Sequence, residues 1–409
     1  MNNRILTEQQ IRPLTLEGTA HQRGLAHGET LRSQIQELVG IWKADLSAEF
    51  GTSADQHIHT FLQRTDFLPA IQEWTPDMLD EIRGIADGSA LPFESLLAFQ
   101  LLDELWAYNE TAAVPHCTSI GLRASGGLRA DAGQPTCVAQ TIDVETFRHG
   151  FQTVLHIRYP DSDLEAFAVT SAGLAAFNGM NNRGVGICCN FLPLTSRQEG
   201  LPVACIVRGV LARKTAQEAR SFVQRVPHAS GQNYLVGGPD SVFDLECSAN
   251  QVVAYQPHGW HDALWHANLP LANDDLNPYF REAVDGPQEN PFIRNNRARF
   301  RAVERRLRQA PRGARLDLLK ETLASRDSDQ DPICSVGDER EFFAGEGIYS
   351  FASTVMKLSA EPELHASFSP SDPSSYTKLG FADGAQPSGF FPRALSQAER
   401  KPAGGDHIA

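Results

Sequence analysis

The feature that most constrains this chain is a change of hydrophobic pattern at Cys117. Before Cys117, apolar residues recur every three or four positions, which is typical of helices. After it, most apolar residues alternate with polar ones or stand in short runs bounded by Gly, Asn and Pro, which is typical of strands. We therefore expect a helix-rich segment, residues 1–116, to pack on the sheets of a strand-rich segment, residues 117–409, in one layered α+β domain.

The pattern also predicts individual elements on both sides of this boundary. In the first segment we expect helices over residues 18–50, 57–66, 76–86 and 93–108. In the second we expect a half-buried strand over 151–159, hairpin strands between 173 and 190, and further strands over 165–170, 232–236, 242–247, 251–255, 350–358 and 363–369. Helices are expected over 216–226, 295–308 and 316–324, residues 204–213 are either a strand or the start of a helix, and residues 269–291 should form a long loop.

The composition argues against several classes of function. A formal net charge of -14 over 409 residues disfavours nucleic acid and anionic membranes as partners. The arginines between residues 294 and 308 could form an anion site, but helical spacing spreads them around a helix, so we interpret them as a solvated face. No apolar stretch is long enough for a signal peptide or a membrane span. The seven cysteines lack metal-ligand spacing, and we expect a cytoplasmic protein with reduced thiols.

A group of histidines invites a metal hypothesis. His258, His261 and His266, together with Asp262, have residue types that ligate zinc. However, Gly259 lies among them, and nothing indicates a helix that would align the ligands. We therefore assign no metal, and the sequence shows no cradle for a nucleotide or for coenzyme A, so we assign no cofactor.

Cys117 is the strongest candidate for chemistry. It follows Pro115 and His116, where the helical segment ends, and it precedes Thr118 and Ser119 at the entry to a strand. A nucleophilic thiol needs a base and a group that stabilises the oxyanion. If the bond between His116 and Cys117 is cut, the new α-amino group, with an ordinary pKa of ~7.7–8.0, can serve as that base.

Seven motifs occur in a recognisable order along the chain. They are G-T-A…G…H-G within residues 18–28, E-I-R-G-I-A-D-G at 81–88, Glu104, C-T at 117–118, A-Q-T-I-D at 139–143, G…G-M-N…G-V…N within 173–190, and H-A-N at 266–268. In this order they resemble the motifs of the isopenicillin-N acyltransferase-like proteins, the C45 group of amino-terminal-nucleophile (Ntn) cysteine hydrolases. The resemblance covers almost the whole chain.

This resemblance implies a fold, a processing step and a set of site residues. The fold would be a four-layer αββα sandwich, and the chain would cut itself between His116 and Cys117 and transfer an acyl group through a thioester on Cys117. The resemblance further implies that the Asn268 side chain donates to the oxyanion, that Asp143 binds the new α-amino group or helps the cleavage, and that Glu104 and Asn190 contact the substrate. The expected partners are a small N-acylated molecule and the two fragments of the chain itself, in a monomer or a homo-oligomer.

Two positions depart from the penicillin enzymes of this family. His116 stands where those enzymes have glycine, and a β-carbon there limits the strained backbone that favours an N-to-S acyl shift. Tyr349 and Ser350 replace a Ser-Arg pair, so an anionic penicillin-type substrate would lose a cationic partner.

The function we predict is hydrolysis of the amide in an N-acylated small amine or amino acid by a self-cleaving cysteine Ntn amidohydrolase. One alternative is an acyl-CoA-dependent N-acyltransferase that uses the same site. A second is an uncleaved binding protein or proenzyme, which His116 keeps open. A third is an unrelated cysteine hydrolase in which His266 acts as the base.

Overall fold

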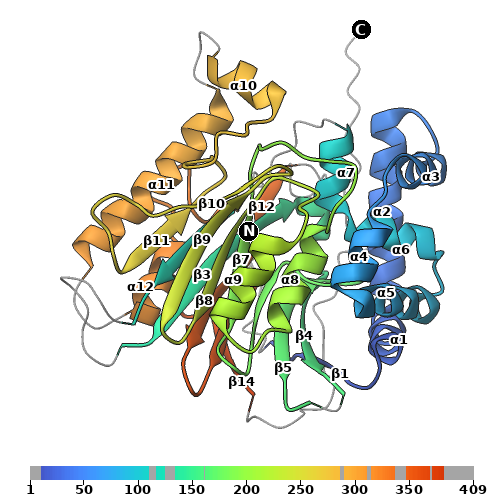
Figure 1. The fold of residues 1–409 in the computed structure, drawn as a ribbon, viewed down its shortest axis with the longest axis horizontal. Coiled ribbons are helices and arrows are strands. Elements are labelled where there is room, and N and C mark those ends of the chain that lie inside the picture. Colours follow the sequence, from blue (N-terminus) through green and yellow to red (C-terminus); the bar gives the residue numbers. More distant parts are fainter. Residues whose placement is uncertain are drawn as a thin grey trace, which may run out of the picture.

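Two β-sheets face each other at the centre of the molecule, and helices lie outside them (Figure 1). The computed structural model describes residues 11–109, 117–124, 134–160, 162–285, 290–310, 315–336, 347–368 and 371–381. His116, and with it one side of the predicted cleavage site, lies outside the described residues.

The larger sheet contains eight strands, of which neighbours are antiparallel except for the parallel pair β1 and β4. In spatial order its strands are β1 (Leu14–Leu16), β4 (Gln152–Arg158), β5 (Glu165–Ser171), β6 (Asn178–Asn181), β7 (Gly186–Phe191), β8 (Gln232–Gly238), β9 (Ser241–Cys247) and β10 (Val252–Ala254). The smaller sheet is antiparallel throughout. Its six strands are, in order, β11 (Ala263–His266), β2 (Thr118–Leu122), β3 (Thr136–Glu145), β12 (Ile348–Leu358), β13 (Glu363–Phe368) and β14 (Thr377–Gly380).

The helices form two separate layers. The first layer comes mainly from the segment before Cys117 and is coloured blue to cyan at the right of Figure 1, with the green α8 and α9 beside it. It consists of α1 (Ala20–Thr30), α2 (Arg32–Phe50), α3 (Ala54–Arg64), α4 (Leu68–Trp74), α5 (Pro76–Ser89), α6 (Phe93–Gln100), α7 (Leu102–Asn109), α8 (Val203–Leu211) and α9 (Ala216–Arg225). The second layer, orange at the left of the figure, contains α11 (Pro291–Gln309) and α12 (Arg315–Leu323), with α10 (Pro278–Asp285) preceding it and the 3-10 turn η1 (Thr146–Arg148) following β3.

Three apolar cores lie between these four layers and confirm the predicted αββα order. One core joins the first helix layer to the larger sheet, the second lies between the sheets, and the third joins the smaller sheet to α11 and α12. Strand β4 shows the logic, because Leu155 and Ile157 face the helices while Val154 faces the other sheet. The predicted alternation of β4 is confirmed, but the prediction of a half-buried strand is wrong, because layers cover both of its faces.

Other differences from the predicted elements are local. The helix expected over residues 18–50 is divided at Leu31 into α1 and α2, and the one over 93–108 is divided at Leu101 into α6 and α7. Of the two alternatives for residues 204–213, the structure shows the helix, α8, whereas α10 interrupts the loop expected over 269–291. All seven cysteines are free thiols. Among the described helices, none is both long and apolar enough to cross a membrane.

The glycines of the first two motifs explain why α1 and α5 cross so closely. A β-carbon at Gly24 would lie 1.9 Å from the Glu81 carbonyl oxygen, and one at Gly84 would lie 2.2 Å from the His21 carbonyl oxygen. Backbone atoms cannot yield as a flexible side chain can, so only glycine permits this contact. These motif residues therefore act in packing.

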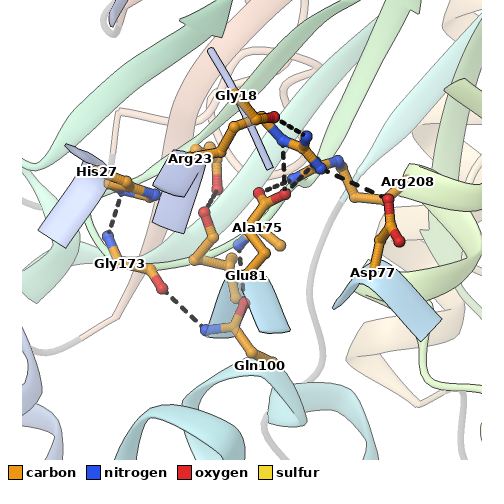
Figure 2. A network of polar contacts seen from close by, with 11 residues as sticks. Gly18, Arg23, His27, Asp77, Glu81, Gln100, Gly173, Ala175 and Arg208 are labelled. Atoms are coloured by element: carbon orange, nitrogen blue, oxygen red, sulfur yellow. Dashed lines mark hydrogen bonds and ion pairs between the residues drawn. The ribbon is translucent and has the colours of Figure 1, made fainter. Parts of the chain in front are cut away.

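A buried ionic network lies where α1, α5 and α8 meet (Figure 2). Glu81, which is 1% exposed, accepts two hydrogen bonds from Arg208, at 2.6 and 2.8 Å, and one from Arg23 at 3.3 Å. Beside it, His27 Nε2 accepts from the backbone N–H of Gly173 at 3.1 Å. Burial lowers the pKa of His27 to about 4, so the ring is neutral and able to accept.

Gln100 holds the same turn from α6. Its side-chain nitrogen donates to the Gly173 carbonyl oxygen at 2.8 Å, and its side-chain oxygen accepts from the Ala175 N–H at 2.8 Å (Figure 2). The turn between β5 and β6 is thus fixed by side chains from the first helix layer. This matters for function because Leu174 and Phe177, which belong to this turn, line the cavity described next.

Candidate active site

Cys117 lies immediately before β2 and lines a partly open cavity of about 60 Å³. The residue is only 7% exposed. The cavity wall combines α7, the end of β3, the turn after β5, the end of β7 and the start of α8. Segments that are distant in the sequence therefore meet around one thiol.

The environment of the thiol keeps it protonated in this chain. Burial raises the pKa of Cys117 to about 12, and the nearby Asp143 carboxylate adds to the shift. The backbone N–H of Asp143 and the charge of Arg299 oppose it without reversing it. Activation of this thiol therefore needs a base or a positive charge placed next to it.

Arg299 of α11 links Cys117 to the predicted oxyanion donor. Its Nη1 donates to the Cys117 carbonyl oxygen at 2.6 Å, and its Nη2 donates to Asn268 Oδ1 at 3.0 Å. Arg299 is completely buried, at 0% exposure. The interpretation of the arginines between residues 294 and 308 as a solvated face is therefore wrong for Arg299, which lies on the buried side of the helix with Asn296 and Val303.

Asn268 is held in one orientation by several partners. The hydrogen bond from Arg299 identifies the side-chain amide atom beside it as the oxygen, Oδ1, so the atom beside Phe191 is the nitrogen, Nδ2. This nitrogen donates to the Phe191 carbonyl oxygen at 3.0 Å. The backbone N–H of Asn268 donates to Asn296 Oδ1 at 2.6 Å. A primary amide has two N–H groups, so one remains after the bond to Phe191.

Glu246 fixes the loop that carries Asn268. Its carboxylate accepts from the backbone N–H groups of Leu271, Ala272 and Asn273, at 2.7, 2.9 and 2.6 Å. It also bonds His266 Nε2 at 2.8 Å, on the other side of Asn268 in the sequence. The loop is therefore tied down on both sides of the predicted oxyanion donor.

These contacts leave His266 unsuited to be a catalytic base. Its Nε2 faces the Glu246 carboxylate, and its Nδ1 faces the Ala267 carbonyl oxygen at 2.8 Å. Both partners are acceptors, so both ring nitrogens carry hydrogen. Burial alone would lower the pKa of His266, but the bond to Glu246 raises it, and the ring has no lone pair to offer.

Asp143 lines the cavity next to Cys117. It is 1% exposed, and neither of its carboxylate oxygens accepts a well-formed hydrogen bond from the described residues. Burial raises the pKa of Asp143 to about 7, against the opposing effects of Arg299 and Ser350. A donor placed beside Asp143 would satisfy these oxygens, which suits the predicted partnership with an α-amino group.

The structure separates the two residues predicted to contact the substrate. Glu104 of α7 lines the cavity, and its Oε1 accepts from the Val203 N–H at 3.1 Å and the Ser230 hydroxyl at 2.9 Å. Asn190 of β7 is absent from the cavity wall. It is completely buried between the sheets, and its Oδ1 accepts from the Ser119 hydroxyl at 2.7 Å. Asn190 therefore supports the strand that begins at Cys117.

Several residues of the site were not predicted from the sequence. Arg299, Asp103, Glu145, Arg148 and Gln232 all belong to it, the first beside Cys117 and the other four on the cavity wall. Helical spacing was the available signal for Arg299, which stands three residues after Asn296 on the buried side of α11. The others gave no signal, because their meeting depends on the packing of α7 against the sheets.

The described residues do not form a metal centre. No three His, Cys, Asp or Glu side chains within the described ranges converge as metal ligands. His258 and His261 are exposed, and His266 is bonded to Glu246.

A family comparison places part of this chain. Residues 132–309 match the family described as acyl-coenzyme A:6-aminopenicillanic acid acyl-transferase. This part of the chain resembles that family. The match confirms the resemblance predicted from the motifs, and it includes Asp143, Asn268 and Arg299. A search of curated proteins finds no match.

Solved structures with similar folds share little sequence with this chain. A mutant and a variant of conjugated bile acid hydrolase from Clostridium perfringens align with TM-scores of 0.36 and 0.38, at 9% and 11% identity, each over 64% of this chain and 92% of the other. Penicillin V acylase from Agrobacterium tumefaciens aligns with a TM-score of 0.35 at 11% identity, over 62% of this chain and 83% of the other. The αββα assignment rests on the order of sheets, helices and cores, not on these scores.

Proposed function

We propose that the chain is a self-cleaving cysteine amidohydrolase of the Ntn type, with Cys117 as the nucleophile. The observation that carries this proposal is the group formed by Cys117, Arg299 and Asn268, in which one buried guanidinium bonds both the nucleophile's carbonyl oxygen and the amide expected to meet the oxyanion. An Ntn mechanism also fits the state of His266, which has no free lone pair. The base would be the α-amino group released by cutting the bond between His116 and Cys117.

The proposed reaction has two steps. The α-amino group takes the thiol proton while Cys117 Sγ attacks the carbonyl carbon of the substrate, and the remaining N–H of Asn268 donates to the oxygen that gains charge. The C–N bond then breaks, the proton passes to the leaving amine, and a thioester remains on Sγ. Water attacks the thioester, releases the carboxylic acid and restores the thiol. Throughout, Asp143 would accept a hydrogen bond from the α-amino group.

Intact mass spectrometry of the purified chain tests this proposal, with Cys117→Ala as the control. We expect two fragments, the larger beginning at Cys117, and a single uncut chain in the control. After addition of an N-acyl substrate, a brief acid quench should show the acyl mass on the Cys117 fragment. An uncut chain that nonetheless hydrolyses amides would contradict the role of the α-amino group.

The family description favours one other reaction, transfer of an acyl group from coenzyme A to an amine. This transferase would use the same thioester on Cys117, with an amine in place of water. The two reactions differ in their need for an acceptor. Release of coenzyme A that requires an added amine would favour the transferase, whereas release of a free acid from an amide would favour the hydrolase.

A further inference from the structure

We propose that the cavity beside Cys117 binds a protonated amine, so that the preferred substrates are amides that also carry an alkylammonium group. This inference rests on the proposed function, because it names the substrate class of the same site. It begins with the charged side chains on the cavity wall, which are Asp103, Glu104, Asp143, Glu145 and Arg148. Four carboxylates therefore share the wall with one guanidinium.

Three of these carboxylates lie in the field of a guanidinium, because the charge of Arg148 acts on Asp103 as well as on Glu145. Glu145 accepts a hydrogen bond from Arg148 Nε at 2.7 Å. Asp143 lies in the field of Arg299, which lowers its pKa against the effect of burial. The Nη1 and Nη2 of Arg148 have no acceptor among the described residues, and a neutral carbonyl oxygen of the substrate would satisfy them.

Asp103 and Glu104 make no ion pair within the described part of the chain. Asp103 Oδ2 accepts from the neutral Gln232 side chain at 2.5 Å. Glu104 Oε1 accepts from neutral donors, and Glu104 Oε2 has no partner, although the residue is only 3% exposed. Burial raises the pKa of both groups, to about 6 for Asp103 and about 8 for Glu104, and their mutual repulsion adds to the second shift.

An alkylammonium ion is the ligand that best relieves this arrangement. The cation would displace the proton that Glu104 holds at neutral pH, donate to Glu104 Oε2 and supply the positive charge that this carboxyl group lacks. Trp106, Leu174 and Phe177 give the same cavity an apolar surface for the alkyl chain. A metal ion fits less well, because no three ligand side chains in the described ranges converge. An anionic ligand would add to the repulsion between the carboxylates.

Matched amides test the preference in the wild-type protein. We would compare kcat/KM for N-acetylcadaverine with that for N-acetylpentylamine, and aminohexanoyl p-nitroanilide with hexanoyl p-nitroanilide, so that the charge lies on either side of the scissile bond. One charge-assisted hydrogen bond should favour the cationic member of at least one pair by roughly tenfold or more. Equal rates in both pairs, or faster hydrolysis of the neutral members, would overturn the inference and leave the proposed function intact.

A binding measurement separates the two proposals if no amide is hydrolysed. Calorimetry on the purified chain should detect pentylammonium but neither pentanol nor pentanoate. Glu104→Gln should weaken the binding of pentylammonium by roughly tenfold, whereas Glu94→Gln, which alters an exposed carboxylate of α6, should not change it. Absence of pentylammonium binding, or equal binding of all three probes, would refute the cation site. Absence of turnover with selective cation binding would count only against the proposed function.

Discussion

Replacement of Arg299 by lysine separates the shape of this side chain from its charge. The guanidinium makes five hydrogen bonds, to Cys117 O, Thr118 Oγ1, Asn268 Oδ1, Asn295 Oδ1 and Asn296 Oδ1. Lysine keeps the positive charge but has only three N–H hydrogens, so at least two of these five hydrogen bonds are lost. A hydrogen bond to a charged group contributes about 1.5–3 kcal/mol, so Arg299→Lys should lower the unfolding free energy by about 3–6 kcal/mol.

Urea denaturation and two activity measurements would test this expectation. The unfolding free energy comes from the urea titration, while mass spectrometry follows the cut before Cys117 and active-site titration gives turnover per thiol. Arg301→Lys is the matched control, because Arg301 lies two residues further along α11 and is exposed. A loss of less than ~1 kcal/mol in Arg299→Lys, with processing and turnover unchanged, would refute the view that the fork of Arg299 holds Cys117 and Asn268 in place.

Three further predictions concern other parts of the molecule. Gly84→Ala should lower the unfolding free energy by about 1–3 kcal/mol, because its β-carbon would meet backbone atoms of α1, whereas Gly40→Ala, with nothing within 4 Å of the new β-carbon, should raise it by about 0.5–1 kcal/mol. Urea titrations that place both variants on the same side of wild type would contradict the close contact between α1 and α5. Since the pKa of Glu104 rises from 4.5 to about 8 on folding, the folded chain holds this proton more tightly than the unfolded chain, and the unfolding free energy should fall as the pH rises from about 5 to about 8. Glu104→Gln should reduce the slope of unfolding free energy against pH, and an unchanged slope would argue against the raised pKa. The raised pKa of Cys117, about 12, predicts that iodoacetamide at neutral pH alkylates the thiol slowly in the uncut chain and faster once the chain is cut. Mass spectrometry of a partly processed sample can compare the two alkylation rates, and equal rates would show that the cut does not activate the thiol.

Hydrophobic periodicity was sufficient to predict a layered α+β domain, whereas the αββα order of its layers came from the family resemblance. The 3.6-residue period before Cys117 and the two-residue period after it correspond to the first helix layer and to most strands of the two sheets. Periodicity could not show that β4 is covered on both faces, because an alternation of apolar and polar residues has the same appearance whether the second face meets water or another sheet. Thr153 and His156 are polar, yet they are 2% and 4% exposed.

The site was harder to predict than the fold, because its contacts connect distant segments. The motifs led to Cys117, Asp143 and Glu104, which the structure brings to one cavity. The bond between Arg299 and Cys117 joins residues 182 positions apart, and no local pattern encodes it. The substrate contact predicted for Asn190 stays a prediction, and the structure shows this residue bonded to Ser119 at the start of β2.

The first helix layer is part of the site as well as its support. Glu104 on α7 forms one wall of the cavity, and Gln100 on α6 with His27 on α1 holds the turn that supplies Leu174 to another wall. All three polar residues precede Cys117, so a cut before Cys117 would divide the site between two fragments. Loss of the fragment that precedes Cys117 would expose the apolar core that its helices share with the larger sheet. It would also remove Glu104 from the cavity wall and Gln100 and His27 from the turn that they hold. The buried ion pair between Glu81 of α5 and Arg208 of α8 joins the two sides of such a cut, so it would help to keep the nucleophile and its cavity together.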